Sequence, residues 1–290
     1  MTRFSAEGLG RAPAGPRIDG DLSDEAWKQA SRTEEWFETN PGDNTPPRVR
    51  NVGYLAYDER FLYVGLEFED PDPSRIRAPL GDHDNLSSTT DYGGVLLDTR
   101  NDGRTGTLFL ANARGLQYDA VSDDGGGGED DSPDFYWDAA GRITATGWTL
   151  EIRVPFASLR YPRTDPQTWG FMLYRNYPRE FRYQFFTTRL PKGTNCFVCH
   201  SNKLVGLTGL PKGGHFVAAP DPITDPVQRD WRAAVGNEKK THAANIPLFM
   251  PGCPPAAALL CRGLDWTRKR PGGAFPFHTS SYFDGILSPL

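Results

Sequence analysis

The sequence predicts an all-β fold, an antiparallel β-sandwich of the jelly-roll or immunoglobulin-like kind with one short helix near the N-terminus. Residues 147–162 support this directly. Apolar and polar side chains alternate from Trp148 to Val154, which is the period of a strand with one buried and one solvated face. Pro155 ends that strand, because proline donates no backbone hydrogen bond to a ladder. Similar patterns recur at short, regular intervals from Val49 onward, as is typical of a sandwich or barrel.

The short helix is expected within residues 18–30, IDGDLSDEAWKQA. Ser23 is expected to cap it, and the acidic side chains of Asp24 and Glu25 suit the positive end of the helix dipole. Trp27 lies on the apolar face of this segment and is expected to anchor it in the core.

About nine or ten strands are expected in all. The clearest pair is 52–57 and 61–69, which a three-residue link joins as a hairpin. The other predicted strands, besides the one that ends at Pro155, are 94–98, 107–112, 116–121, 142–146, 169–175 and 183–188. Period-two alternation places the following side chains in the core: Leu62, Val64, Leu66, Phe68, Trp148, Leu150, Ile152, Val154, Trp169 and Phe171.

The composition bounds the class of protein. Hydrophobic residues make up 38% of the 290 residues and aromatics 12%, which is ample for a folded core. The net charge is -5 and no Lys/Arg-rich stripe is present, so nucleic acid and anionic membranes are not expected partners. No apolar run approaches the roughly 20 residues that span a bilayer. The N-terminus lacks the apolar region of a secretory signal; taken literally this predicts the cytosol, although a mis-assigned start would look the same.

Two domains are expected. Residues 17–219 form the sandwich. From residue 220 neither period two nor period 3.6 is sustained, and ten of the 25 prolines lie in this last segment. Residues 220–290 are therefore predicted to be a largely unstructured, proline-rich tail.

Two acidic segments leave two interpretations open. Residues 123–134 read DDGGGGEDDSPD, and residues 69–91 contain five more aspartates. Either segment is a solvated loop, or several of its oxygens bind calcium, which takes six to eight oxygen ligands. Neither segment has the spacing of a fixed calcium motif, so the metal ligands stay unassigned.

Cys196-Phe-Val-Cys199-His200 is the sharpest local motif. It matches the attachment signature of c-type haem, in which the two thiols bind the vinyl groups and the histidine binds iron. A disulfide, or half of a zinc site with Cys253 and Cys261, fits the same residues. The flanking polar residues offer little cover for a porphyrin, so the disulfide is preferred over haem. Candidates for a sixth haem ligand are Met172, His215 and Met250.

No catalytic motif is present. The sequence lacks a G-x-S-x-G elbow, an H-E-x-x-H helix and a phosphate-binding glycine loop. We therefore expect no catalytic residues and no enzymatic activity.

Aromatic and polar side chains do cluster near predicted strand ends. Flat rings stack on the apolar faces of sugars while carboxylate, amide and guanidinium groups bind hydroxyls, although aromatic residues in strands also serve simply to pack the sheet. The predicted carbohydrate contacts are Trp137, Tyr136, Tyr92, Arg104, Asp91 and Asn112.

Five motifs in order resemble a known family. They are IDGDLSDEAWKQA, LAYDERFLYVGLEFEDPDP, LLDTRNDGRTGTLFLANARGLQYDA, WDAAGRITATGWTLEIRVPFASLRYP and WGFMLYR. Together they are similar to the family 9 carbohydrate-binding module and its DOMON-like relatives, of the kind found at the N-terminus of bacterial outer-membrane proteins of unknown function.

The resemblance implies non-catalytic carbohydrate binding within an exported polysaccharide-binding or polysaccharide-degrading system, in the periplasm, at the outer membrane or outside the cell, with calcium commonly bound. It implies a pair of tryptophans around the sugar; Trp27, Trp148 and Trp169 lie in framework motifs, which leaves Trp36 and Trp137. The relatives of this family also include haem-binding domains that serve electron transfer, so a c-type haem at Cys196, Cys199 and His200 remains the alternative function. The resembling proteins continue into a further membrane domain, so segment 220–290 is expected to be a truncated remnant.

Overall fold

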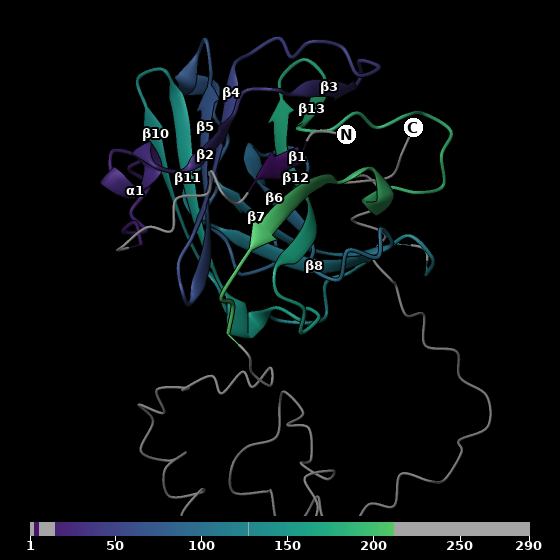
Figure 1. Ribbon diagram of the computed structural model, residues 1–290. Helices are drawn as coiled ribbons and strands as arrows, with labels where there is room; N and C mark the ends of the chain where they lie inside the picture. Colours follow the sequence, from purple (N-terminus) through teal and green to yellow (C-terminus); the bar gives the residue numbers. More distant parts are fainter. Residues whose placement is uncertain (1–2, 6–14, 127, 212–290) are drawn as a thin grey trace, which may run out of the picture. The chain divides into compact units, whose positions relative to one another are not determined.

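Two β-sheets packed face to face form the described part of the protein, as predicted (Figure 1). The computed structural model describes residues 3–5, 15–126 and 128–211. These residues all lie in one unit of the chain. The predicted tail from residue 220 therefore lies outside the described residues.

The smaller sheet has five strands in the order β10-β11-β5-β4-β2. The strands are β2 (Ser31–Thr33), β4 (Asn51–Tyr57), β5 (Phe61–Glu69), β10 (Asp138–Thr144) and β11 (Gly147–Pro155). β11 pairs with β5 so that Trp148 lies opposite Phe68 and Leu150 opposite Leu66. The core side chains predicted from alternation on these two strands are all buried, because the period-two pattern sets which side of the sheet each side chain faces.

The larger sheet has nine strands, with the path β1-β14-β12-β6-β7-β8-β9 and with β13 pairing both β12 and β3. Its strands are β1 (Arg3–Ser5), β3 (Phe37–Asn40), β6 (Tyr92–Asp98), β7 (Thr105–Asn112), β8 (Gln117–Asp123), β9 (Gly128–Asp130), β12 (Gln167–Pro178), β13 (Arg182–Phe186) and β14 (Asn202–Leu207). All pairs are antiparallel except β1 with β14. The strands that the sequence did not predict are mostly three or four residues long, too short to show alternation.

Two local predictions were wrong. The helix α1 (Glu25–Lys28) begins after Asp24, not after Ser23, and no side chain caps it. Trp27 holds this helix instead, since its indole Nε1 donates a hydrogen bond to Glu151 Oε1 at 2.7 Å. The acidic segment 123–134 is not loop throughout, because its residues 128–130 form β9 and pair with β8.

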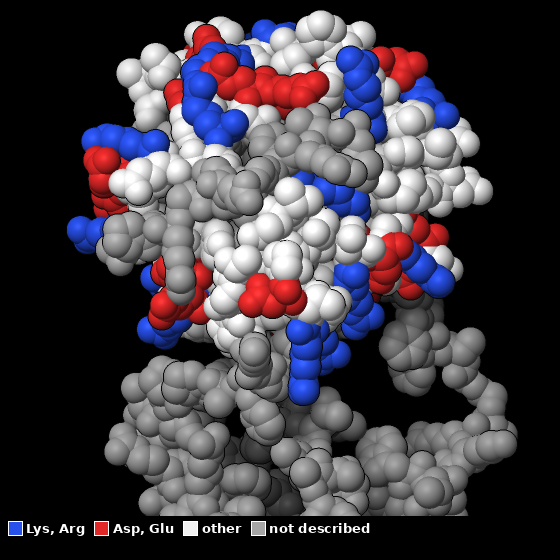
Figure 2. Space-filling view, in the orientation of Figure 1, with Lys and Arg blue, Asp and Glu red and all other residues white. Residues whose placement is uncertain are grey.

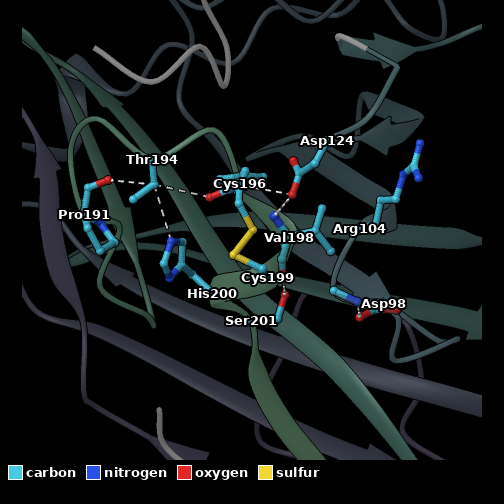
Figure 3. The surroundings of a disulfide bond; sticks show 12 residues. Asp98, Arg104, Asp124, Pro191, Thr194, Cys196, Val198, Cys199, His200 and Ser201 are labelled. Atoms are coloured by element: carbon cyan, nitrogen blue, oxygen red, sulfur yellow. Dashed lines mark hydrogen bonds between the residues drawn. A yellow bond between two sulfur atoms is a disulfide. The ribbon is translucent and has the colours of Figure 1, made fainter.

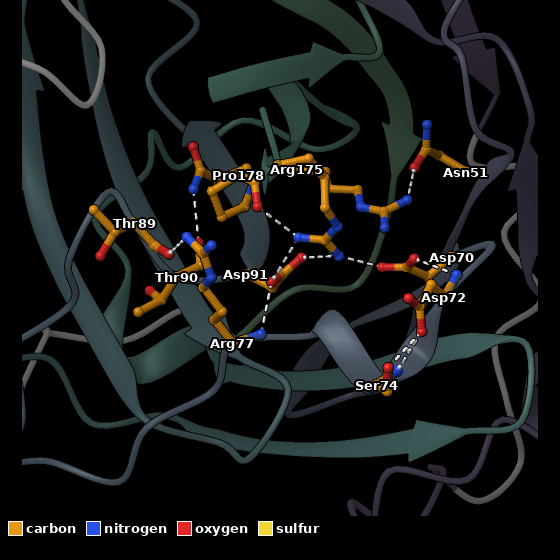
Figure 4. A network of polar contacts seen from close by, with 12 residues as sticks. Asn51, Asp70, Asp72, Ser74, Arg77, Thr89, Thr90, Asp91, Arg175 and Pro178 are labelled. Atoms are coloured by element: carbon orange, nitrogen blue, oxygen red, sulfur yellow. Dashed lines mark hydrogen bonds and ion pairs between the residues drawn. The ribbon is translucent and has the colours of Figure 1, made fainter. Parts of the chain in front are cut away.

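A network of buried charged side chains joins β12 to the segments that follow β5 and precede β6 (Figure 4). Arg179 Nη2 forms ion pairs with Asp70 and with Asp91, 3.0 Å from Asp91 Oδ1. Arg175 is fully buried next to them, donates to Asn51 Oδ1 at 2.7 Å and lies over the Phe68 ring. Burial lowers the pKa of Arg175 to about 10. These charges stabilise the fold only as a group, because each is removed from water.

The surface carries charges of both signs. On the face shown in Figure 2, lysine and arginine are interspersed with aspartate and glutamate around uncharged surface. Among the described residues, no helix has both the length and the apolar character needed to cross a membrane.

Candidate functional site

The two tryptophans left as sugar-stacking candidates are both core residues. Trp137 is 5% exposed and packs edge-on against Phe109, with ring centroids 5.3 Å apart. Its Nε1 donates to Asp119 Oδ2 at 2.7 Å. Trp36 is also buried and packs against Phe68 in a T-shaped arrangement. Neither ring has a free face for a sugar, so burial overturns the prediction that Trp137 stacks on ligand.

Asp91 and Asn112 are both buried and have partners inside the fold. Asp91 is buried against Arg179 and also accepts the Arg77 backbone N–H at 2.8 Å. Burial raises the pKa of Asp91, although Arg179 opposes this effect. Asn112 closes the turn between β7 and β8, where its Oδ1 accepts the N–H groups of Arg114 and Leu116. Both residues serve the fold in this structure, contrary to their predicted role as hydroxyl partners.

Tyr136 and Arg104 are exposed but are not brought together by any described contact. Tyr136 is 56% exposed, and only its backbone carbonyl is engaged, by the Ser158 hydroxyl. Arg104 Nε lies 3.2 Å from Asp123 Oδ1 in an exposed ion pair. Of the six predicted contacts, only Tyr92 and Asn112 face each other, as cross-strand partners on β6 and β7.

The CxxCH segment is a surface loop that ends in a single 3₁₀ turn, Val198–His200. Cys196 and Cys199 are joined by a disulfide (Figure 3). Asp124, in the turn between β8 and β9, accepts the backbone N–H groups of Phe197 and Val198 at 2.9 and 2.8 Å. Of the candidate sixth ligands, Met172 is buried in β12, and His215 and Met250 lie outside the described residues, as do Cys253 and Cys261.

The structure groups other aromatic and polar side chains on the side of the nine-stranded sheet that faces away from the five-stranded sheet. In β6, Val95 and Leu97 point into the core between the sheets, while Tyr92 and Leu96 belong to a second cluster on the opposite side. Strand register extends this side across the sheet. We call it the outer face and define it by the following residues: Tyr92, Tyr118, Glu129, Tyr174, Asn176, Arg182, Gln184 and Phe186.

Tyrosines form the floor of the outer face. Tyr92, Tyr118 and Tyr174 are all at most 2% exposed. The rings of Tyr92 and Tyr174 have centroids 5.7 Å apart, and Tyr174 lies 4.6 Å from Phe186. Offset and tilted aromatic pairs of this kind hold one another rigidly.

Half-buried polar side chains lie above this floor. Arg182 donates from Nη2 to the Tyr92 hydroxyl at 3.2 Å and from Nε to Asn176 Oδ1 at 2.9 Å. Gln184 Nε2 donates to the Tyr174 hydroxyl at 3.0 Å. Asn176 is itself buried and serves to hold Arg182. Arginine and glutamine side chains held in this way present fixed donors and acceptors, which is what recognition of hydroxyl groups requires.

Glu129 is the unusual member of the outer face. Its Oε2 accepts the Tyr118 hydroxyl at 3.2 Å, and its buried Oε1 has no hydrogen-bond partner among the described residues. Burial raises the pKa of Glu129 to about 7, against the smaller opposing effects of the Tyr118 hydrogen bond and of Arg182. A buried polar atom without a partner is uncommon in a folded protein, so Glu129 offers an acceptor to a bound hydroxyl.

Sequence reasoning missed most of the outer face for identifiable reasons. The strands predicted at 169–175 and 183–188 contain or adjoin Tyr174, Arg182 and Gln184. These side chains alternate with the core residues along their strands and so face the other side of the sheet. The alternation that selected Trp169 and Phe171 for the core could have assigned their neighbours to the other face. Glu129 had no such signal, because β9 is only three residues long.

No protein-family model matches the sequence, and no curated protein is significantly similar to it. Several solved structures resemble the fold, including the following three. A family 9 carbohydrate-binding module from Caldicellulosiruptor kristjanssonii in complex with cellotriose is 16% identical and covers 69% of this chain and 92% of its own, with a TM-score of 0.47. The glucose complex of a family 9 module from the same organism is 16% identical, with coverages of 73% and 99% and a TM-score of 0.49.

A candidate carbohydrate-binding protein from Bacteroides uniformis is 10% identical and covers 70% of this chain and 98% of its own, with a TM-score of 0.55. At this identity the similarity establishes the fold alone, because unrelated functions share common folds. The resemblance predicted from the ordered sequence motifs is therefore confirmed as a resemblance of fold.

Proposed function

We propose that the described β-sandwich is a non-catalytic carbohydrate-binding domain whose ligand lies on the outer face of the nine-stranded sheet. The observation that supports this most is Glu129, a half-buried carboxyl group with an oxygen that lacks a hydrogen-bond partner among the described residues, above a floor of tyrosines. A saccharide hydroxyl would supply the missing donor. The Bacteroides uniformis protein with the same fold is a candidate carbohydrate-binding protein, which agrees with the proposal.

Arg182 and Gln184 complete the proposed polar rim. Arg182 already bridges Tyr92 and Asn176, so its guanidinium is fixed in direction before a ligand arrives. A group that is fixed in advance loses little conformational freedom when it binds. The tyrosine rings below are buried, so their part is to hold these polar groups in place, and the sugar would contact the half-buried side chains above them.

The proposed setting is an exported polysaccharide-binding system. Disulfides persist in oxidising compartments and are rare in the cytosol, and the Cys196–Cys199 bond supports such a compartment. The ordered motifs that resemble exported carbohydrate-binding proteins support the same setting.

Calorimetric titration tests the proposal better than tryptophan fluorescence, because every described tryptophan is buried in a cluster away from the outer face. Glucose, galactose, xylose and their β-linked oligomers, followed by pull-down on insoluble polysaccharides, form a suitable panel. We expect at least one saccharide to bind and no reducing sugar to be released. Absence of binding to every saccharide and polysaccharide of the panel would contradict the proposal.

Variants locate the site. Glu129→Gln and Arg182→Ala are each expected to weaken binding about tenfold or more, because each removes a charge-assisted hydrogen bond. Asp130→Asn is the matched control, since this exposed neighbour of Glu129 bonds only within its own turn, to Ser132. If all three variants bind like the wild type, the ligand lies elsewhere.

A further inference from the structure

A histidine and two aspartates from the two acidic segments of the sequence meet in the folded chain. His83 and Asp84 come from the loop that precedes β6, and Asp134 from the segment that follows β9. One ligand atom from each of the three lies within 4.8 Å of the others, and no other such group was found in the described residues. This group is separate from the residues proposed above to bind saccharide.

A buried carboxylate orients the imidazole of His83. Asp119 is 1% exposed, and its Oδ2 accepts the Trp137 indole N–H at 2.7 Å while its Oδ1 accepts the Phe135 N–H at 3.1 Å. His83 Nε2 lies 3.4 Å from Asp119 Oδ2. Histidines that bind metals are typically held in this way, by a carboxylate on the nitrogen that does not bind the metal.

The other nitrogen faces an acceptor. His83 Nδ1 lies 2.8 Å from Asp84 Oδ2, and the second oxygen of Asp84 is already engaged by the Asp119 backbone N–H at 3.2 Å. If the ring proton is on Nε2, facing Asp119, a lone pair on Nδ1 points at a carboxylate oxygen. Two acceptors at this distance repel unless a cation or a second ring proton lies between them.

The described residues supply no other positive charge for this group. Neither Asp84 nor Asp134 forms an ion pair with lysine or arginine in the described part of the chain. His83 and Asp134 are exposed, so an ion from solvent can reach them.

We propose that His83, Asp84 and Asp134 bind a divalent transition-metal ion, with Zn²⁺ the best match. One imidazole nitrogen with two carboxylate oxygens is a zinc-type donor set, and water can complete the coordination. Calcium takes six to eight oxygens and does not favour imidazole, so it fits this group poorly. The ion links two segments that are far apart in the sequence, and binding to the folded state alone raises its stability.

The test uses the full chain without a histidine tag, stripped with EDTA and then titrated with Zn²⁺, Mn²⁺ or Ca²⁺ while heat and melting temperature are recorded. We expect Zn²⁺ to raise the melting temperature, and EDTA to reverse the rise. His83→Ala and Asp134→Asn are expected to weaken zinc binding at least about tenfold. Asp82→Asn is the matched control, because it removes an exposed carboxylate next to His83 that is outside the group.

Zinc bound elsewhere in the chain would still bind to all three variants, so the quantity to compare is the change in zinc binding relative to wild type. Equal zinc affinity and equal thermal shift in wild type, His83→Ala and Asp134→Asn would overturn the proposal, as would an equal response to Ca²⁺. If zinc changes neither the heat nor the melting temperature of the wild type, the metal proposal fails. No saccharide enters this experiment, so its outcome is independent of carbohydrate binding.

Discussion

The hydroxyl of Tyr118 donates a hydrogen bond to Glu129 Oε2 across the β8–β9 pair, at 3.2 Å. Tyr118 lies opposite Leu110 on β7, and Glu129 lies opposite Ser122 on β8. This register places the carboxyl group on the outer face beside Arg182, where burial raises its pKa. The pairing of the short strand β9 with β8 therefore determines that the outer face carries a carboxyl group.

The raised pKa of Glu129 predicts a pH dependence of stability. The pKa is about 7 in the folded protein, against an ordinary value of 4.5, so the folded state binds more protons between these values. The free energy of unfolding is therefore expected to fall as pH rises from about 4.5 through 7, by roughly 2 kcal/mol from this group after allowance for screening. Urea titrations at several pH values should show that Glu129→Gln removes this part of the decline. Asp130→Asn should keep it.

Arg179 is expected to be essential to the stability of the core. Its side chain is 4% exposed, and Arg179→Ala leaves Asp70 and Asp91 buried without their cation. Loss of one partner from a buried ion pair costs about 3–5 kcal/mol. The matched control is Arg104→Ala, whose exposed pair with Asp123 is worth at most about 1 kcal/mol. Equal losses for both variants in chemical denaturation would contradict the prediction.

Trp137 is expected to matter for folding and not for ligand. Trp137→Phe keeps the ring in the core but removes the N–H that Asp119 Oδ2 accepts. A buried acceptor that loses its donor costs about 1–3 kcal/mol. Thermal melting should therefore show a loss of stability, and calorimetry an unchanged saccharide affinity. A weaker saccharide affinity with unchanged stability would contradict this prediction and would indicate that Trp137 contacts the ligand.

Cys196 and Cys199 are expected to be oxidised when the full chain is produced in an oxidising compartment. The loop they close is short, so replacing both with serine should lower stability by only about 2 kcal/mol. Mass spectrometry without reduction should find the pair joined. Export of the full chain together with a haem-maturation system provides the opposing test, since a Soret band that survives acid–acetone extraction would place haem on these thiols.

The sequence by itself was sufficient for the parts of the fold that depend on neighbouring residues. Alternation along β5 and β11 identified Leu62, Leu66, Trp148 and Ile152 as core residues, and all four are buried. Alternation is a local property of a strand, because successive side chains point to opposite faces whatever the strand pairs with. Trp27 was predictable from another local pattern, the apolar face of the short helix.

Only the tertiary structure decided which polar residues are available for function. Asp91 and Trp137 are suited to sugar binding by their chemistry, but Arg179 and Asp119 occupy their polar atoms inside the fold. Glu129 looked like part of a solvated acidic loop until its pairing with β8 placed it on the outer face. These contacts depend on strand register and on segments that are distant in the sequence. The free energy of burying a charge depends on the same contacts, and the residue's own sequence neighbours do not determine it.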